Sequence, residues 1–511
     1  MNSAEFKAFI YMFIPFIASY AETHYHLKYL FPKYFTKFPE IIFDIPKRVC
    51  TNRSNTLPLL LIIKDADKFP IKLLEIEIKI LGYNSYKEIF NRKIETPYFS
   101  VIIDLDISHL SPGKYQLIAE IKVTKKNKTY LFINDNYQGL TPVPFQFHIT
   151  DKLPYPTGWY AGEPHYHSNY TNDQVEFGAD LGSTTVMAKA MGLDWFFVTD
   201  HSYDLDDKPD NYLQFDPHLS KWKDMQSQVS QHDSPDCRIL AGEELSVGNF
   251  KHRNVHLLII NNQKFLQGFG DSAEKWFHNK PTMNISNITK EPAALYIAAH
   301  PNERVPLIQK ISLRRSNWQT DDFLENNIQF LQIINDDNHI DSSIEYWKEL
   351  LLAGHKFFLL AGNDAHGNFN LMRQIEKPFL KLFSNRNQIF GNWHTVFKYK
   401  ENTPIEGLKN KQIIVSNGPF MNFWLEDATG SYHIGQTIAA GNYKINWELA
   451  TTEEFGDFTQ IDIWQGYQQR ETRLKKQING ASVYLPASSY LRFSGKTQKG
   501  GRVFCNPIWL I

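Results

Sequence analysis

The stretch GEPHYHSNYTND, residues 162 to 173, places His165 and His167 one residue apart, directly behind the apolar and aromatic run GWYA. In a β-strand, the side chains of residues i and i+2 point to the same face of the sheet. If a strand ends here, both imidazoles face one cavity. What they could bind depends on which other side chains the fold brings to the same place.

Residues 158 to 417 alternate between apolar strands and helical segments. Helices are predicted over ADLGSTTVMAKAMG (179–192) and PHLSKWKDMQSQVSQH (217–232). Continuous apolar runs are typical of strands buried on both faces of a parallel sheet, and their alternation with helices predicts βα units. The predicted strands after the opening stretch are LDWFFVTDHS, RILAGEELS, NVHLLII, LYIAAHP, FLQIIN and KFFLLAGNDAHG. At least six such strands predict a closed barrel rather than an open sheet.

Polar side chains fall where these apolar runs stop. The C-terminal strand ends of a (β/α) barrel converge on one mouth, which is where active sites are found. Imidazole nitrogen with carboxylate oxygen is a ligand set for zinc, manganese or iron, without the thiolates of structural zinc sites. The residues at these positions are His165, His167, Asp200, His201, Glu243, Glu244, His256, His300, Asp364 and His366.

The bulk composition excludes several function classes. The 511 residues predict two or three domains. A net charge of −1 gives no field that would recruit nucleic acid or an anionic membrane, so no nucleic-acid partner is expected. Cys50, Cys237 and Cys505 lie far apart, which argues against a disulfide framework or a cysteine zinc site.

Both ends of the chain predict other structures. An apolar run at residues 9 to 18 is too short to span a bilayer, and a docked helical segment is expected over residues 1–39. A cytoplasmic location is favoured, with secretion or a periplasmic location as the alternative. Short β-branched and aromatic segments predict a β-sandwich over 40–150 and a second β domain over 418–511, and residues 151–158 are interpreted as a linker.

The motifs HYHS, VTDHS, GEE, AAHP and GNDAHG, in this order, resemble those of the polymerase and histidinol phosphatase (PHP) superfamily. The resemblance covers residues 158–417. The longer stretches SNYTNDQVEFGAD, NGPF and NPIW resemble the carbaryl-hydrolase-like branch of that superfamily. This resemblance implies a distorted (β/α)7 barrel that holds two or three divalent ions (Zn, Mn or Fe) and mostly hydrolyses phosphoesters.

The resemblance also implies a ligand set, residue by residue. One ion would be bound by His165, His167, Glu243 and Asp364, and Glu243 would bridge to a second ion held by His256 and His300. A third ion would use His201 and His366. Many relatives complete that site with another histidine, and this chain offers Asp173 or Glu176 there. Glu244 is interpreted as a solvated or second-row neighbour of Glu243.

The combined hypothesis is a metal-dependent hydrolase, a phosphoesterase that uses a metal-bound hydroxide and acts on a small anionic phosphoester. Asp200 or His201 would accept or donate a proton, and Arg304 or Arg253 would bind the phosphate through bidentate hydrogen bonds. Three alternatives stay open. The same site could hydrolyse a carbamate, ester or amide; the chain could be a non-enzymatic β-sandwich binding protein; and Asp200 could be a helix cap or a residue that orients a ligand.

Overall fold

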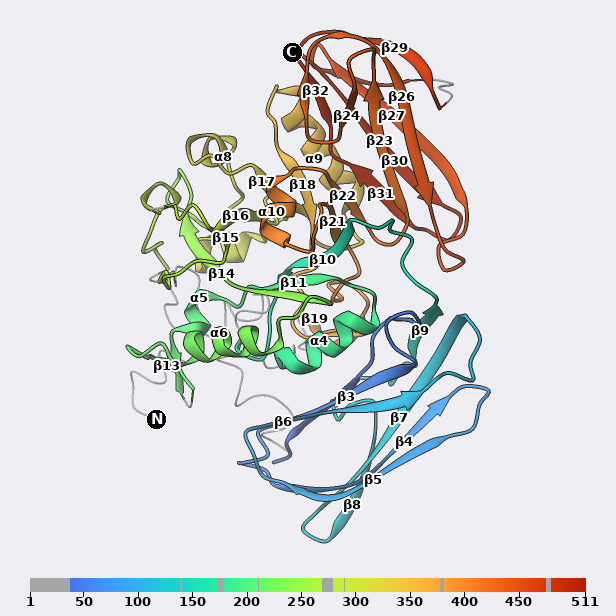
Figure 1. Ribbon diagram of the computed structural model, residues 1–511. Coiled ribbons are helices and arrows are strands. Elements are labelled where there is room, and N and C mark those ends of the chain that lie inside the picture. The colour runs from blue at the N-terminus through green and yellow to red at the C-terminus, as the bar shows by residue number, and fades with distance from the viewer. Residues whose placement is uncertain are drawn as a thin grey trace.

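The computed structural model describes residues 37–137, 140–171, 178–209, 211–268, 279–288, 290–376, 381–474 and 479–511 (Figure 1). The predicted N-terminal apolar segment, apart from its last three residues, and both Asp173 and Glu176 lie outside the described residues. Within the described part of the chain, no helix has the length and apolarity needed to cross a membrane. The chain runs from N-terminal sheets at the bottom of Figure 1, through a central α/β part, to C-terminal sheets at the top.

Two sheets near the N-terminus share one apolar core. In β4, buried side chains alternate with more exposed ones, as expected for a strand that covers a core on one face. Leu59 and Leu61 of the first sheet and Ile76 and Ile121 of the second belong to the same buried cluster. The first sheet has the order β1 (Glu40–Asp44), β3 (Thr56–Lys64), β6 (Tyr98–Asp106). The second has the order β2 (Arg48–Cys50), β9 (Phe145–Thr150), β7 (Gly113–Lys125), β4 (Ile71–Ile80), β5 (Tyr86–Ile94), and β8 (Lys128–Ile133) pairs with β7.

The central part is built on a single path of paired strands. Neighbours are parallel from β10 to β14 and again from β16 to β18. The segment that follows β18 lies beside the end of β10, where Tyr166 and Ala365 form a parallel bridge. The central strands therefore curve round, so that the segment after β18 reaches the end of β10. In path order the strands are β10 (Trp159–Tyr166), β11 (Trp195–Val198), β14 (Arg238–Gly248), β15 (Asn254–Ile260), β16 (Leu295–Ala299), β17 (Phe330–Ile334) and β18 (Phe358–Ala361).

The strand NVHLLII departs from the predicted parallel arrangement. It forms β15, which is antiparallel to both β14 and β16. Only residues 249–253 connect β14 to β15, and a parallel crossover needs a dozen or more residues. The chain must therefore turn back on itself, and the predicted βα alternation fails at this hairpin.

Helices cover the central sheet. The two predicted helices are present as α4 (Leu181–Ala190) and α6 (Ser220–His232), which contact each other. Asp180 caps α4 by accepting a hydrogen bond from the Ser183 N–H. The other helices of the described residues are α5 (Ser202–Leu205), α7 (Leu307–Ser312), α8 (Thr320–Glu325), α9 (Ile340–Leu352), α10 (Pro404–Lys409) and the 3-10 turn η3 (Ile285–Asn287). Two hairpins are formed by β12 (Asp207–Lys208) with β13 (Asn211–Phe215) and by β19 (Met372–Glu376) with β20 (Lys381–Asn385).

The C-terminal strands continue the central sheet instead of forming only a separate one. On the other side of β10 the path runs through β21 (His394–Lys398), β22 (Ile413–Ser416), β31 (Arg502–Cys505), β30 (Ser489–Thr497), β27 (Phe458–Tyr467) and β28 (Arg470–Arg473). The short strands β25 (Thr437–Ile438) and β32 (Ile508–Leu510) join the same sheet. A further sheet packs on it, with the order β24 (Ser431–His433), β23 (Phe420–Glu426), β26 (Gly441–Ala450), β29 (Ala481–Leu485).

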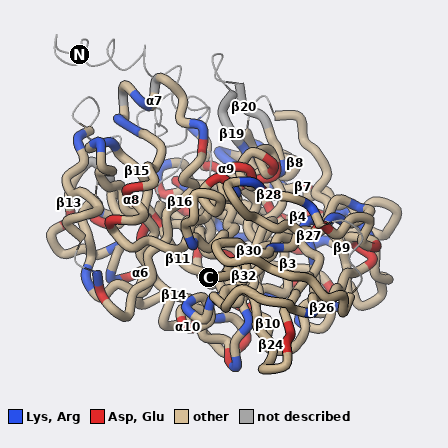
Figure 2. Tube along the Cα trace, turned by 90° about the horizontal axis from the view of Figure 1, so that it is seen from above, with Lys and Arg blue, Asp and Glu red and all other residues tan. Residues whose placement is uncertain are grey.

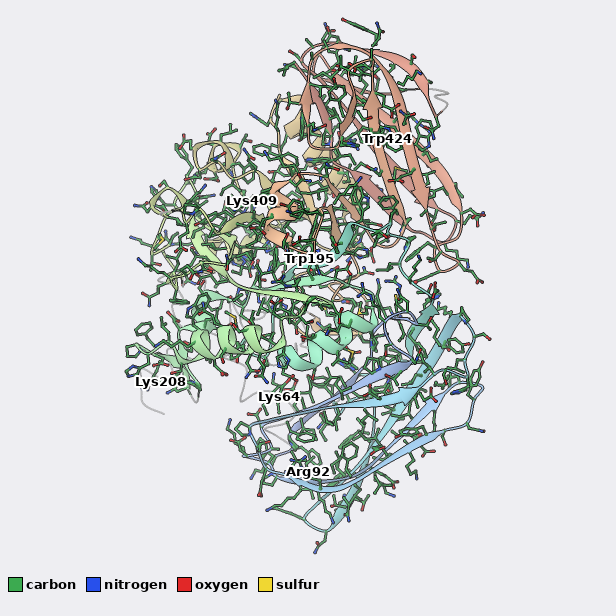
Figure 3. The ribbon with its side chains drawn as sticks, in the orientation of Figure 1. Lys64, Arg92, Trp195, Lys208, Lys409 and Trp424 are labelled. Atoms are coloured by element: carbon green, nitrogen blue, oxygen red, sulfur yellow. The ribbon has the colours of Figure 1, made fainter. Side chains whose placement is uncertain are left out.

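Close packing fixes the start of the opening motif. Trp195 on β11 lies inside the molecule, fully buried, beside Gly162 on β10 (Figure 3). A Cβ atom at Gly162 would lie 2.2 Å from the Trp195 ring, so this position has no room for a side chain. Trp195 thus sets the position of β10 immediately before its two histidines. Lys, Arg, Asp and Glu are interspersed along the described chain (Figure 2).

Candidate metal centre

A buried carboxylate, Glu244, lies at the middle of a group of histidines. Its exposed fraction is 1 %, and its two oxygens lie 2.7–3.4 Å from imidazole nitrogens of five residues on four different segments. The shortest of these contacts joins His256 Nδ1 to Glu244 Oε1, at 2.7 Å. The five histidines are His165, His167, His201, His256 and His300.

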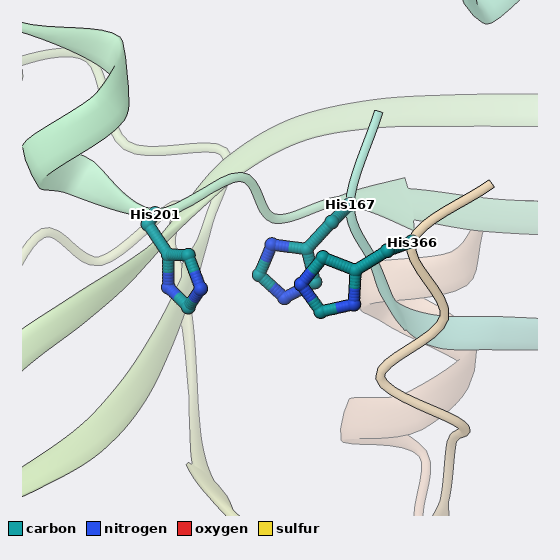
Figure 4. A group of neighbouring side chains, drawn as sticks. All are labelled: His167, His201 and His366. Carbon is teal, nitrogen blue, oxygen red and sulfur yellow. The ribbon is translucent and has the colours of Figure 1, made fainter. Parts of the chain in front are cut away.

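A second carboxylate, Asp364, closes the group from the segment after β18. Its Oδ1 lies 3.2 Å from His165 Nε2 and 3.0 Å from His167 Nε2. The two Nε2 atoms are themselves 3.1 Å apart, so the HxH pair does face one point. On the other side of this pair, His167, His201 and His366 gather from three separate segments (Figure 4), and the His167 and His366 rings are stacked.

A buried glutamate that sequence reasoning missed connects β10 to segments that follow β18. Glu163, two residues before His165, accepts hydrogen bonds from the Asn363 N–H (2.9 Å) and from the Gly391 N–H (3.1 Å). The Asn363 side-chain amide also donates to it. These bonds place Asp364 opposite β10. Burial raises the pKa of Glu163 to about 8, which the hydrogen bonds only partly offset.

Backbone conformation also marks the site. His300 (φ 28°) and Asp364 (φ 50°) both occupy the left-handed region, which non-glycine residues seldom adopt. Such conformations cost about 1–3 kcal/mol each and cluster at functional sites, where the surrounding structure enforces them. The strain therefore indicates that the positions of these two side chains matter more than local stability.

Hydrogen bonds on the outer sides of the rings orient the inward-facing nitrogens. His165 Nδ1 lies 2.7 Å from Gln332 Oε1, and Gln332 in turn donates from Nε2 to Asn335 Oδ1. An amide oxygen only accepts, so His165 carries its proton on Nδ1 and presents the Nε2 lone pair to the centre. Glu303 orients the His300 ring in the same way, because its Oε2 lies 2.9 Å from His300 Nδ1. Partners of this kind are characteristic of histidines that bind metal ions.

The electrostatics of the group favour a positive charge at its middle. Burial alone would raise the pKa of Glu244 and of Asp364, but the surrounding imidazoles hold both well below their usual values. Burial alone would lower the pKa of His167, but Asp364 and Glu244 raise it well above its ordinary value. Both carboxylates are therefore ionised, and they stabilise cations next to them.

The donor set fits divalent ions. His201 Nδ1, Glu244 Oε2 and Asp364 Oδ1 are buried polar atoms that make no hydrogen bond of good geometry among the described residues, although His201 Nδ1 and Glu244 Oε2 lie only 2.9 Å apart. Buried polar atoms are rarely left in this state unless an ion or water satisfies them. Three overlapping groups could each hold an ion, namely His165, His167, Glu244 and Asp364; His201, Glu244 and His256; and His167, His201 and His366. All donors are imidazole nitrogen or carboxylate oxygen, which suits Zn, Mn or Fe.

Comparisons with known proteins give only remote similarities. No protein-family description matches the chain, and neither does any curated protein. One solved structure, a two-domain protein from Bacteroides vulgatus containing a predicted PHP-like metal-dependent phosphoesterase, is 11% identical; the alignment covers 70% of this chain and 98% of that one, with a TM-score of 0.31. A β-glucuronidase from Parabacteroides merdae is 8% identical, over 93% of this chain and 65% of that one, with a TM-score of 0.20.

The structure corrects the predicted position of the central carboxylate. Glu243 points to the opposite face of β14, where its oxygens accept hydrogen bonds from Ser202 Oγ (2.9 Å), Asn262 Nδ2 (2.6 Å) and the Leu266 N–H (3.0 Å). Glu243 therefore lies outside the group of histidines, and Glu244 occupies the place that was assigned to it. Successive side chains of a strand point to opposite faces, so the two glutamates cannot both face the centre.

Asp200 and Arg253 also lie away from the centre. Both oxygens of Asp200 accept hydrogen bonds from Ser168 and Thr171, which fixes the loop after His167. Asp200 therefore orients this loop, as in one of the alternatives above. Arg253 is exposed, and its guanidinium donates to the Lys310 carbonyl at 2.7 Å.

Arg304, by contrast, lines a pocket that reaches the centre. The pocket has a volume of about 490 Å³, and His300 forms part of its wall. Gln388, another wall residue, donates from Nε2 to Asp364 Oδ2 at 3.3 Å. The first turn of α9 contributes Ser342 and Ser343. A small molecule in this pocket therefore has access to the edge of the centre formed by His300 and Asp364.

Proposed function

We propose that this protein is a metal-dependent hydrolase that acts on phosphoesters. The observation that carries the proposal is the convergence of two ionised carboxylates, Glu244 and Asp364, on inward-facing imidazole nitrogens. The rings of His165 and His300 are held in this orientation by hydrogen bonds that they donate to Gln332 and Glu303. The motif resemblance to the PHP superfamily and the curved sheet support the same proposal, which includes the distorted (β/α)7 barrel of that superfamily.

The residues present would hold two or three ions. His165, His167, Glu244 and Asp364 would hold one, and Glu244 would be shared with a second held by His256 with His201 or His300. His167, His201 and His366 form the third group. Divalent ions in such a group lower the pKa of a bound water and neutralise charge that develops on the substrate.

The chain's own residues then have distinct roles. Gln332 and Glu303 keep the His165 and His300 rings in their orientation, and Asp200 holds the loop that carries His167. His201 belongs to two of the three groups, with Nδ1 2.9 Å from Glu244; if His300 rather than His201 completes the second group and the third holds no ion, His201 is the residue placed to hold or pass a proton. Arg304 supplies a guanidinium for the non-bridging oxygens of a phosphoryl group.

Charge in the pocket favours a phosphoester over a carbamate, carboxylic ester or amide. The wall contains Arg304 and the N-terminal turn of the 13-residue helix α9, whose backbone N–H groups attract anions. Of the two carboxylates in the wall, Glu303 is paired with His300, and Asp336 accepts a hydrogen bond from the Asn338 N–H. A neutral carbonyl substrate has no comparable need for a cation at this place.

We expect the purified protein to carry two or three divalent ions per chain and to cleave phosphate mono- or diesters. Elemental analysis measures the metal content, and chromogenic phosphate esters assayed beside aryl carbamates and acetates define the reaction. A protein that neither holds nor takes up metal would contradict the metal centre. Turnover of carbonyl substrates alone would replace the phosphoesterase proposal by the carbonyl alternative.

Replacement of Arg304 by alanine should lower kcat/KM for a phosphoester about ten-fold or more, because a charge-assisted hydrogen bond contributes about 1.5–3 kcal/mol. Arg253→Ala is the matched control, since this arginine is exposed and bonded to a backbone carbonyl. Steady-state kinetics with inorganic phosphate as a competitive inhibitor measure both variants. Equal effects of the two substitutions would show that Arg304 does not contact the phosphoryl group.

A further inference from the structure

The pocket beside the metal centre is lined mainly by neutral groups that form hydrogen bonds. Ser342 and Ser343 contribute hydroxyls, and Ile333 is the aliphatic side chain among the described lining residues. Apart from the imidazoles of His300 and His339, that lining includes no aromatic ring. Five side-chain amides form much of the remaining wall, those of Asn302, Asn335, Asn338, Asn387 and Gln388.

We propose that the pocket binds the alcohol part of the substrate and that this part is a polyhydroxylated, sugar-like group. The inference rests on the phosphoesterase function proposed above and specifies its substrate class. In the reaction, water adds to phosphorus and the phosphorus–oxygen bond to the sugar breaks. The alcohol leaves with a proton derived from the water, and inorganic phosphate is the other product.

The amides present both donors and acceptors, as hydroxyl recognition requires. A hydroxyl group donates one hydrogen bond and accepts others, and a side-chain amide can match both functions. Asn335 uses its oxygen to accept from Gln332 at 2.7 Å and so keeps its NH2 group as a donor. Asn302 donates to Ser343 Oγ at 3.1 Å and so keeps its carbonyl oxygen as an acceptor.

The same wall is poorly suited to an aryl group or a nucleobase. Such flat, apolar groups are bound by hydrophobic and aromatic surfaces, on which they stack. Here Ile333 would be their main apolar contact, and an aromatic ring would separate the amides from water without satisfying them. The volume of about 490 Å³ is sufficient for a small ligand.

The position of the pocket allows one ligand to contact both the pocket wall and the metal centre. His300 lines the pocket, and its Nε2 lies 3.3 Å from Glu244 Oε1. Gln388 lines it as well and bonds Asp364. A phosphoryl group at the metal centre therefore leaves its ester substituent directed along the amides, with Arg304 in the same wall.

The test compares substrates and one pocket variant. The substrates are glucose 6-phosphate, AMP and p-nitrophenyl phosphate, assayed with the metal-loaded full chain. We expect kcat/KM to be highest for glucose 6-phosphate. Asn387→Leu should lower the ratio of kcat/KM for glucose 6-phosphate to that for p-nitrophenyl phosphate at least about five-fold, because a lost hydrogen bond leaves a substrate hydroxyl unpaired. Asn387 takes part in none of the bonds that orient the metal centre.

A control variant and a binding measurement complete the test. Asn84→Leu makes the same change in an exposed turn between β4 and β5 and should leave the ratio unchanged. Calorimetry with glucose 6-phosphate and chelator-treated protein should show weaker binding to Asn387→Leu. Faster turnover of the aryl ester, or an unchanged ratio in Asn387→Leu, overturns the sugar-like substrate while phosphoesterase activity stands. Faster turnover of AMP overturns the exclusion of a nucleobase from the pocket. If no phosphoester is cleaved, the proposed function itself fails and this inference falls with it.

Discussion

Replacement of Glu244 by glutamine is expected to remove at least one bound metal ion per chain and to lower hydrolytic activity by about three orders of magnitude or more. The Glu244 carboxylate faces five imidazoles at 2.7–3.4 Å, and the substitution removes the negative charge that would be shared between ions. Elemental analysis after gel filtration measures the ions, and steady-state kinetics on the best phosphoester measure the activity.

The neighbouring residue provides a closely matched control. Glu243→Gln makes the same chemical change one residue earlier on β14, on the opposite face. A glutamine there can still accept from Asn262 and Leu266 through its oxygen and donate to Ser202 Oγ through its NH2 group. The metal content of Glu243→Gln should match that of the unmodified protein. Loss of metal in Glu243→Gln but not in Glu244→Gln would reinstate the ligand set inferred from the motif.

The choice between these two glutamates shows where sequence reasoning stops. The motif GEE places a carboxylate at this strand end but does not say which one faces inward. The face is decided by the pairing of β14 with β15, in which Ser246 lies opposite His256, and Glu244 is two residues from Ser246 on the same face. That register depends on the conformation of residues 249–253, which no sequence pattern predicted.

Other parts of the site were accessible from sequence for a clear physical reason. HxH at a strand end places two imidazoles on one side by the two-residue period of a strand, and His165 and His167 do face one point. Gln332, Glu303 and Glu163 were missed because their roles depend on contacts between segments far apart in the chain, such as Glu163 with Asn363 and Gly391. A buried polar residue inside an apolar strand, as in FLQII, was the one available signal for Gln332.

In the fold as well, local sequence patterns predicted individual elements but not the pairing between distant ones. Apolar runs predicted the buried strands β11, β16, β17 and β18, and the two segments predicted as helical contain α4 and α6. The antiparallel placement of β15 was missed because an apolar run alone carries no direction. Continuation of the central sheet into β31 and β30 was missed as well, since strand pairing across residues 417 to 488 leaves no local pattern.

A buried ion pair between the first and last thirds of the chain leads to the second large expected effect. Arg48 on β2 is fully buried and donates to Glu454 through Nε (2.5 Å) and through a terminal nitrogen (2.7 Å). Burial alone would raise the pKa of Glu454, but Arg48 lowers it below the ordinary value. The pair therefore connects the N-terminal sheets to the C-terminal part of the chain with both groups ionised.

Glu454→Gln should destabilise the protein by about 3 kcal/mol, because the Arg48 guanidinium stays buried without a compensating charge. Thermal or urea unfolding of the full chain measures the change, and Glu453→Gln, at an exposed neighbouring position, should leave the transition within experimental error. The double variant Arg48→Met with Glu454→Leu should recover most of the loss, since replacing both members of a buried pair by apolar groups removes the desolvation penalty together with the attraction. If Glu454→Gln and the unmodified protein unfold at the same temperature or urea concentration, the ion pair does not stabilise the contact between the N-terminal sheets and the C-terminal part of the chain. If the double variant is as unstable as the single one, the connection depends on the shape of the two side chains and not on their charge.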